Sequence, residues 1–157
     1  MSYALFTLVI HAQVPKEGDT SGITSFTGTF MAVAMGHKRV QLIYEVYGVN
    51  ISDTVQDLLH NASFRCVGSM HAIKNVYEDD TGFCINIRLD GDQVFLTYKA
   101  SGKMGVGGKA RYTYVGGTGK LTGIQGGGEF ERISSVRAAA EGTFQGYIRG
   151  KGHYKLP

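Results

Sequence analysis

Hydrophobic and polar side chains alternate along much of this chain. In residues 24–34, Phe26, Gly28 and Phe30 share one face at a period of two, which is the period of a β-strand. The alternation is most regular in residues 83–89, where the apolar set is Phe83, Ile85, Ile87 and Leu89. We therefore expect strands that turn these apolar positions toward a core and the intervening positions toward solvent.

Eight to ten short strands are predicted from this alternation and from apolar, β-branched runs. The segments are residues 5–12, 24–34, 39–49, 64–73, 83–89, 93–100, 109–115, 128–133 and 142–154. Residues 14–19 and 74–82 are predicted to be loops because they are polar or contain Pro and Gly. One short helix is expected near residues 53–60, where Asp53 and Gln56 have the spacing of a capping box.

The tripeptide Asp90-Gly91-Asp92 separates two of these strands. An Asp-Gly pair between alternating runs is a strong hairpin signal. It favours a type I′ turn, in which both central residues have positive φ. We therefore predict a hairpin at this position.

Glycine is unusually frequent, with 23 glycines and only 2 prolines in 157 residues. Because glycine destabilises helix interiors, this composition favours strands and tight turns. Glycines also lie inside the predicted strands, for example at Gly28, Gly68 and Gly146, and such positions suit the bends of a barrel wall. We predict one all-β domain over residues 1–157, a closed antiparallel barrel of about eight strands.

The charge pattern argues against a nucleic acid or a membrane as partner. The net charge is only +3 and the basic residues are dispersed, whereas nucleic-acid-binding surfaces concentrate them. No run approaches the roughly 18 apolar residues of a membrane span. The apolar start lacks a cationic n-region, which favours a strand over a signal peptide. As given, the sequence is expected to be cytoplasmic; a secreted or periplasmic protein whose leader had been removed would look the same.

Two glycine-rich segments imitate nucleotide-binding motifs without the required context. Around Gly119-Lys120, the Walker pattern would need Gly in place of Tyr114 and Ser or Thr in place of Leu121. Residues 105–110 match GxGxxA but lead into a predicted strand and not into a helix. The five histidines are scattered singly, without the spacing of metal ligands. We expect neither a metal site nor a cofactor.

Cys66 and Cys84 are the two cysteines of the chain. Two are too few for a disulfide framework. One disulfide and two buried free thiols are both compatible with the sequence.

The tyrosines are the most informative side chains for function. With the more apolar face of each strand turned inward, several tyrosine hydroxyls enter an apolar interior, where each needs a partner. Such an interior suits an apolar small molecule bearing a carbonyl, a hydroxyl or a ring. The expected ligand-binding residues are Phe6, Phe30, Tyr44, Met70, Leu96, Tyr114 and Phe144, and the expected catalytic tyrosines are Tyr98 and Tyr112. A packed core whose tyrosine hydroxyls leave through the barrel mouths is the alternative.

Glu45 is a further catalytic candidate. It follows Tyr44 directly, so the two side chains point to opposite faces of their strand. If Glu45 turned inward, its desolvated carboxylate could act as a general base. If it turned outward, it would be an ordinary surface carboxylate.

Residues 115–130 resemble the strand–GGTG–strand element of plant dirigent proteins and of the allene oxide cyclase barrels. The matching residues are Gly116-Gly117-Thr118-Gly119 and Gly126-Gly127-Gly128-Glu129-Phe130. Uncharacterised bacterial barrels of the same type are also similar at Arg65-Cys66-Val67-Gly68, at Asp90-Gly91-Asp92 and at residues 142–157. The resemblance covers about residues 64–157 and implies an eight-stranded antiparallel barrel, often oligomeric, with a hydrophobic cavity. The matching residues form turns, so they carry over the fold and not the chemistry.

The resemblance implies either cofactor-free cyclases and isomerases or dirigent proteins that guide radical coupling. The leading hypothesis is a cofactor-independent cyclase, isomerase or lyase-like enzyme acting on an apolar small molecule in the barrel. The alternatives are a non-catalytic small-molecule-binding barrel, either a carrier or a dirigent-type protein, and a structural module with a filled interior. A homo-oligomer is the expected assembly. An inward ionisable group within hydrogen-bond reach of a tyrosine hydroxyl would favour the enzyme.

Overall fold

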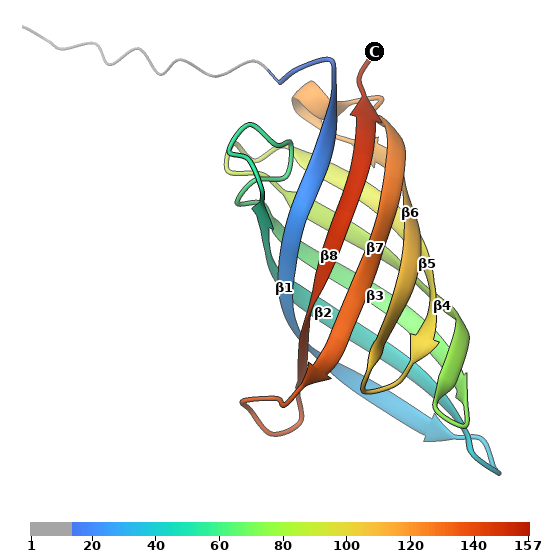
Figure 1. Ribbon diagram of the computed structural model, residues 1–157. Helices are drawn as coiled ribbons and strands as arrows, with labels where there is room; N and C mark the ends of the chain where they lie inside the picture. The colour runs from blue at the N-terminus through green and yellow to red at the C-terminus, as the bar shows by residue number, and fades with distance from the viewer. Residues whose placement is uncertain (1–13) are drawn as a thin grey trace, which may run out of the picture.

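Eight strands make up most of the described chain, which the computed structural model defines over residues 14–157 (Figure 1). In order they are β1 (Glu17–Ala34), β2 (Arg39–Ser52), β3 (Ser63–Ile73), β4 (Val76–Ile87), β5 (Gln93–Lys103), β6 (Gly107–Gly117), β7 (Gln125–Val136) and β8 (Phe144–Lys155). Each strand pairs antiparallel with the next, and β8 pairs with β1, so the sheet closes on itself. The predicted all-β closed barrel is confirmed. The strand predicted at residues 5–12, which includes Phe6, lies outside the described residues.

The inner face of the wall follows the predicted period of two on β1 and β2. Phe26, Leu42, Tyr44 and Val46 are all buried in the main core. Because alternate residues of a strand point to opposite faces, the residues between them form the outer wall. Pairing of β1 with β8 leaves neither strand with an open edge, which is how a barrel avoids edge-to-edge association.

The turn between β3 and β4 corrects the prediction of a loop at residues 74–82. Lys74 and Asn75 both have positive φ, 52° and 67°, as in the two-residue turns that join antiparallel strands. Strand β4 then begins at Val76. The acidic residues that suggested a loop, Glu78 and Asp79, are exposed residues of a strand that bulges at this point.

The hairpin predicted at Asp90-Gly91-Asp92 is present, although its turn differs from the expected type. Only Gly91 has positive φ there, 87°. The Gly91 N–H donates to the Arg88 carbonyl at 3.0 Å, and the Arg88 N–H donates to the Asp92 carbonyl at 2.9 Å. This is a three-residue loop whose last residue is left-handed, which is the next most common way to close a hairpin.

The helix predicted near residues 53–60 is wrong. This segment forms successive turns, and the helical structure in residues 14–157 is limited to one 3-10 turn, η1 (Gly119–Leu121). The Asp57 carboxylate accepts the N–H groups of Leu59 and Ser21, each at 2.8 Å. Such side-chain-to-backbone bonds compete with helical ones. The turns instead fold over one end of the barrel, where Leu58 is buried.

The regular alternation in β4 has the opposite orientation from the one expected. Phe83 and Ile87 are 40% and 41% exposed on the outer wall, whereas Cys84 and Asn86 are buried on the inner face. Alternation fixes a period but not which face is inward, and a shift of one residue exchanges the two. Here Cys84 lies directly opposite Cys66 of β3, and the two form a disulfide inside the barrel. Of the two alternatives compatible with the sequence, the structure shows the disulfide and not two free thiols.

A second apolar cluster fills the barrel end at which β8 finishes. It contains Leu58, Val94, Tyr114, Leu121, Ile124, Tyr154 and Leu156. The glycine-rich turn before η1 is held over this cluster, because the Gln93 N–H donates to Thr118 Oγ1 at 2.9 Å. Gly119 has a φ of 52°, in the left-handed region that favours glycine, and a Cβ there would also displace the Asp92 carboxylate. The segment that imitates a phosphate loop thus forms a structural turn.

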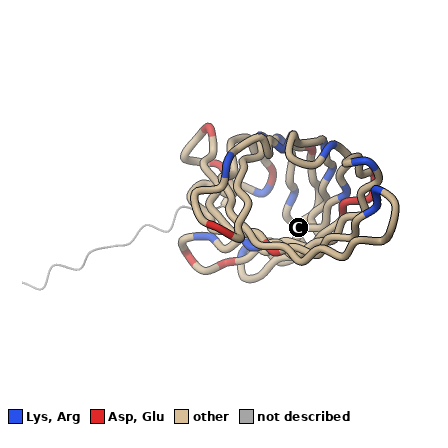
Figure 2. Tube along the Cα trace, turned by 90° about the horizontal axis from the view of Figure 1, so that it is seen from below, with Lys and Arg blue, Asp and Glu red and all other residues tan. Residues whose placement is uncertain are grey.

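Charged side chains are spread around the outside of the wall. Viewed along the barrel, basic and acidic residues both occur around the ring (Figure 2). Lys99 pairs with Asp79 at 2.8 Å and Lys151 pairs with Glu129 at 3.2 Å. Within residues 14–157, no helix has the length and hydrophobicity needed to cross a bilayer.

Candidate functional site

The barrel encloses a cavity of about 330 Å³, a size found among small-molecule sites. Seven residues expected from the sequence line it: Phe30, Tyr44, Met70, Leu96, Tyr98, Tyr112 and Phe144. Phe30 lies toward one end and is 51% exposed. One described residue of the expected ligand-binding set is not part of the lining. Tyr114 is buried in the cluster that fills the other end, and Phe6 lies outside the described residues.

Glu45 lies on the outer wall and does not reach the cavity. Its neighbours in the strand, Tyr44 and Val46, point inward, so its own side chain points outward. The Glu45 carboxylate is 40% exposed and forms an ion pair with Arg65. The expectation that Glu45 turns inward and acts as a general base is therefore corrected: Glu45 is an ordinary surface carboxylate.

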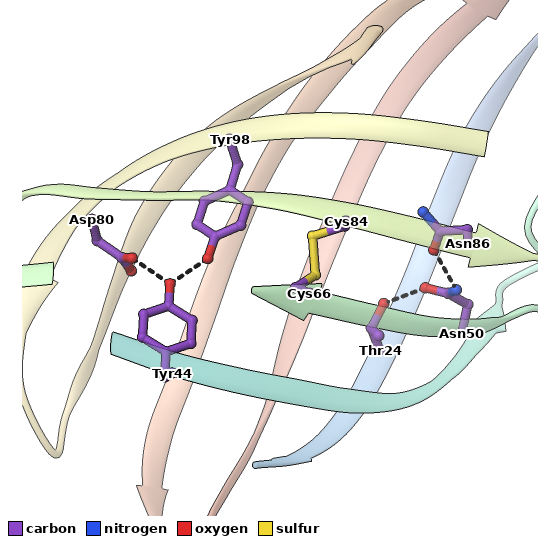
Figure 3. Close-up of a disulfide and its surroundings, with 8 residues drawn as sticks. All are labelled: Thr24, Tyr44, Asn50, Cys66, Asp80, Cys84, Asn86 and Tyr98. Carbon is purple, nitrogen blue, oxygen red and sulfur yellow. Dashed lines mark hydrogen bonds between the residues drawn. A yellow bond between two sulfur atoms is a disulfide. The ribbon is translucent and has the colours of Figure 1, made fainter. Parts of the chain in front are cut away.

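Four side chains from four strands meet inside the barrel, and three of them are drawn in Figure 3. The Tyr44 hydroxyl donates to Asp80 Oδ1 and also contacts the Tyr98 hydroxyl. Arg132 Nη1 donates to Asp80 Oδ2 at 2.5 Å, and the Arg132 guanidinium carbon lies 5.9 Å from the centre of the Tyr98 ring. Asp80 has no exposed surface, and the Arg132 side chain is 14% exposed. An ion pair and two tyrosine hydroxyls thus share one buried cluster.

A bulge in β4 places Asp80 in this cluster. Tyr77 pairs with Gly102 of β5 and Asp80 pairs with Ala100, so two residues of β4 lie opposite one residue of β5. Such an extra residue shifts the alternation of the strand that carries it. Tyr77 and Asp80 therefore both face inward, although they are three positions apart. The exposed pair between them, Glu78 and Asp79, occupies the bulge.

Two adjacent glycines make room for the tyrosine pair. Tyr44, Gly68, Gly82 and Tyr98 are direct neighbours across β2, β3, β4 and β5. A Cβ on Gly68 would lie 2.7 Å from both hydroxyl oxygens, and a Cβ on Gly82 would lie 2.5 Å from the Tyr98 oxygen. The two rings extend toward each other over these glycines, and their hydroxyls meet there.

The contacts define the direction of the hydrogen bonds. Each tyrosine has one hydroxyl proton, and Tyr44 gives its proton to Asp80. The contact between the two hydroxyls must then be donated by Tyr98. The hydrogen-bonded chain runs from Tyr98 to Tyr44 to Asp80. The Tyr98 oxygen has two lone pairs; Arg132 can donate to one, and a ligand can donate to the other.

Burial and charge shift the pKa values in this cluster. Burial, followed by the nearby Asp80 charge, raises the pKa of Tyr98 to about 12. Burial and the neighbouring Tyr98 raise the pKa of Tyr44 further. Burial alone would lower the pKa of Arg132, but the Asp80 carboxylate and the two tyrosines together outweigh it and the net shift is upward. At neutral pH both tyrosines are therefore protonated and Arg132 is charged.

A second polar group borders the same cavity. Thr24 Oγ1 donates to Asn50 Oδ1 at 2.7 Å, and Asn50 Nδ2 donates to Asn86 Oδ1 at 3.0 Å (Figure 3). Asn50 and Asn86 are both buried and line the cavity. The Cys66–Cys84 disulfide lies between these amides and the tyrosine pair (Figure 3).

Comparison with known proteins found no relative of this chain. No family model, curated protein or solved structure matches the chain. Function is therefore argued from the cavity and its side chains. Among residues 14–157, no group of three or more His, Cys, Asp or Glu side chains is arranged to hold a metal ion.

Sequence reasoning missed Asp80, Arg132 and Asn86, for different reasons. Asp80 lies in a segment that the sequence predicts to be a loop. No local sequence signal indicates the bulge that turns its side chain inward. Arg132 could have been found, because it is in phase with the inward Phe130 of β7. The regular apolar set of β4 predicts that Asn86 faces solvent, whereas Phe83 and Ile87 of that set face outward and Asn86 is buried.

Proposed function

We propose that this barrel binds an apolar small molecule bearing an oxygen function and catalyses its isomerisation or ring closure. One observation carries the proposal: Tyr44, which lines a mainly apolar cavity, is hydrogen-bonded to a fully buried carboxylate, Asp80. Buried ionisable groups of this kind concentrate at catalytic sites. A filled structural core would instead be packed without a cavity of this size.

The hydrogen-bonded chain can carry a proton away from the substrate. A substrate hydroxyl gives its proton to the Tyr98 oxygen, Tyr98 passes its own proton to Tyr44, and Tyr44 passes its proton to Asp80. The substrate is left as an oxyanion and Asp80 becomes neutral. The electron pair on oxygen can then drive a double-bond shift or a ring closure, after which the proton returns along the same chain.

Arg132 keeps the charge balanced during this transfer. Before it, the guanidinium is paired with the Asp80 carboxylate at 2.5 Å. Afterwards the negative charge is on the substrate oxygen, and the nearby guanidinium compensates it there. Because Arg132 is already fixed in a largely water-excluded site, this stabilisation needs little reorganisation. Apolar side chains such as Phe144, Met70 and Leu96 would hold the carbon skeleton in a reactive shape.

The resemblance to the allene oxide cyclase and dirigent barrels is compatible with this proposal, and membership of that superfamily is part of it. A non-catalytic carrier would use the same cavity without the proton chain. The homo-oligomer stays a prediction, which light scattering of the purified protein tests.

The first experiment is native mass spectrometry of protein isolated from its own host, followed by extraction of any retained molecule. That molecule is then incubated with the wild-type protein and with Tyr98→Phe, Asp80→Asn and Tyr47→Phe variants. Tyr47 lies on the outer wall and is 51% exposed, so Tyr47→Phe is the matched control. We expect conversion by the wild type and the control, and a loss of ~100-fold or more in both cavity variants. Retention without conversion would identify a carrier.

A further inference from the structure

The amide orientations in the Thr24–Asn50–Asn86 group follow from one backbone carbonyl. The carbonyl of Ala62 can only accept, so the Asn50 atom that faces it at 3.0 Å must be the nitrogen. Asn50 Oδ1 is then free to accept from Thr24, at 2.7 Å. The second Asn50 N–H points to Asn86, so the Asn86 atom that faces it must be an oxygen. The Asn86 amide is therefore fixed in one orientation.

This orientation aims two N–H donors away from Asn50. In Figure 3 the Asn86 nitrogen points away from the Asn50 side chain, on the side of the disulfide. Asn86 is 4% exposed and lines the cavity. Its Nδ2 makes no hydrogen bond to the described residues. The Asn86 donors therefore face the cavity, where an acceptor must come from water or from a ligand and not from the described residues.

The Asn86 donors and the tyrosine pair lie at a defined separation along β4. The Tyr98 hydroxyl rests over Gly82, and Gly82 precedes Asn86 by four residues, which is roughly 13 Å along a strand. Between them the lining is apolar, with the disulfide on β3 and β4 and Leu96 on β5. The stretch of wall between the tyrosine pair and Asn86 is therefore apolar.

We infer that the substrate is an elongated apolar molecule with an oxygen function at each end, the one at Asn86 being a carbonyl-type acceptor. This inference rests on the proposed function, which concerns the end bound at Tyr98. Asn86 would bind the carbonyl at the end of the molecule opposite Tyr98, and this contact would set how far the molecule enters the barrel. A molecule with a single oxygen function would leave one polar group unsatisfied and bind more weakly.

The test compares two probes, the hydroxy ester methyl 10-hydroxydecanoate and the alcohol 1-dodecanol, by titration into the wild-type protein. Each has a flexible apolar chain with a terminal hydroxyl that can donate to the Tyr98 oxygen, and only the first has a carbonyl group at the other end. We expect the hydroxy ester to bind about tenfold more tightly, the value of one additional hydrogen bond in a buried site. The preference should disappear in Asn86→Leu. It should also disappear in Asn86→Asp, which still accepts from Asn50 but has no N–H to give. Thr24→Val, which leaves the Asn86 donors in place, is the control and should keep the preference.

The outcomes separate the two proposals. Equal affinities in the wild type, or a preference that survives both Asn86 variants, would overturn the inference and mean that water alone satisfies Asn86. In that case the proposed function still stands if Tyr98→Phe weakens binding of both probes. Failure of both probes to bind the wild-type protein would overturn the inference and the proposed function together.

Discussion

Asp80 and Arg132 are charged side chains in a largely buried site, where a charge costs free energy. Removing an ion pair from water costs several kcal/mol per ion, and the attraction between the two charges repays this only with good geometry and additional hydrogen bonds. Here the Asp80 carboxylate accepts from Arg132 through one oxygen and from Tyr44 through the other. Replacing the pair by apolar residues would be a simpler way to stabilise a core. Its presence in a cavity wall therefore supports a chemical role.

Asp80→Asn tests how far the two charges depend on each other. The variant leaves Arg132 as a buried charge without a counter-charge, so we expect a loss of about 3–5 kcal/mol in the free energy of unfolding. Adding Arg132→Met removes that charge, and the double variant should recover most of the loss. Urea unfolding of the wild type, both single variants and the double variant gives the coupling energy. A double variant that is destabilised by the sum of the single effects would contradict the pairing.

The buried tyrosines predict a loss of stability in alkali. The pKa of Tyr98 is raised from 10.0 to about 12, mainly by burial, so the folded state holds this proton more tightly than the unfolded chain. The resulting stabilisation, about 3 kcal/mol, is complete below pH 10 and is lost as the pH rises toward 12. Tyrosinate absorbance and urea unfolding, both measured across this pH range, test the expectation.

Tyr98→Phe provides the comparison for this titration. It should make the fall in stability above pH 10 smaller, because one of the late-titrating tyrosines is gone while Tyr44, whose pKa is raised further, remains. A wild-type protein in which all tyrosines ionise together near 10, with no change in unfolding free energy, would contradict the burial of Tyr98.

At the scale of the strands, the sequence predicted where the strands lie along the chain, but it predicted only part of the set of residues that face the cavity. Each of the eight described strands overlaps a predicted segment, because turn residues such as Gly91 and apolar periodicity are local signals, although β1 and β4 begin inside segments predicted to be loops. The bulge that turns Asp80 inward has no local signal, since it depends on how β4 pairs with both neighbours. The inner face of β4 was misassigned because its outer face is the more apolar one. Position along the chain was therefore predictable, and orientation was not.

The glycine row across β3 and β4 yields a prediction at this scale. A Cβ on Gly82 would lie 2.5 Å from the Tyr98 oxygen, so Gly82→Ala should push the Tyr98 ring away from Tyr44. We expect a destabilisation of about 1–3 kcal/mol, as for other overpacked sites. The pKa of Tyr98 should also change, because the contact with Tyr44 that lowers it would be lost. Urea unfolding and alkaline titration of the same variant measure both effects.

Gly116→Ala is the control for this substitution. Gly116 also lies in a strand, but the atom nearest to a Cβ there is 3.4 Å away on Phe95, an ordinary contact. It should leave the tyrosine titration unchanged. Equal effects of Gly82→Ala and Gly116→Ala would show that glycine in a strand matters generally and not through the tyrosine pair.

At the scale of the whole molecule, the barrel is closed by backbone pairing around the entire ring. The contacts between β1 and β8 are as regular as those between neighbouring hairpin strands. The disulfide adds a covalent link between two strands that already pair directly. It therefore does not define the topology. It restricts the unfolded chain, and it forms part of the cavity wall between the tyrosines and the amides.

Reduction of the disulfide should consequently weaken the barrel without opening it. Cys66 and Cys84 are separated by 18 residues, and a link that closes a loop of this size stabilises by about 3 kcal/mol, because the unfolded chain has less freedom to gain. The ladder between β3 and β4 persists without it, so the reduced protein should keep its β-sheet circular dichroism and unfold at a lower urea concentration. A Cys66→Ala/Cys84→Ala double variant should behave like the reduced protein and be insensitive to reductant. Loss of sheet signal on reduction at room temperature would mean that the link, and not the strand pairing, holds this side of the barrel together.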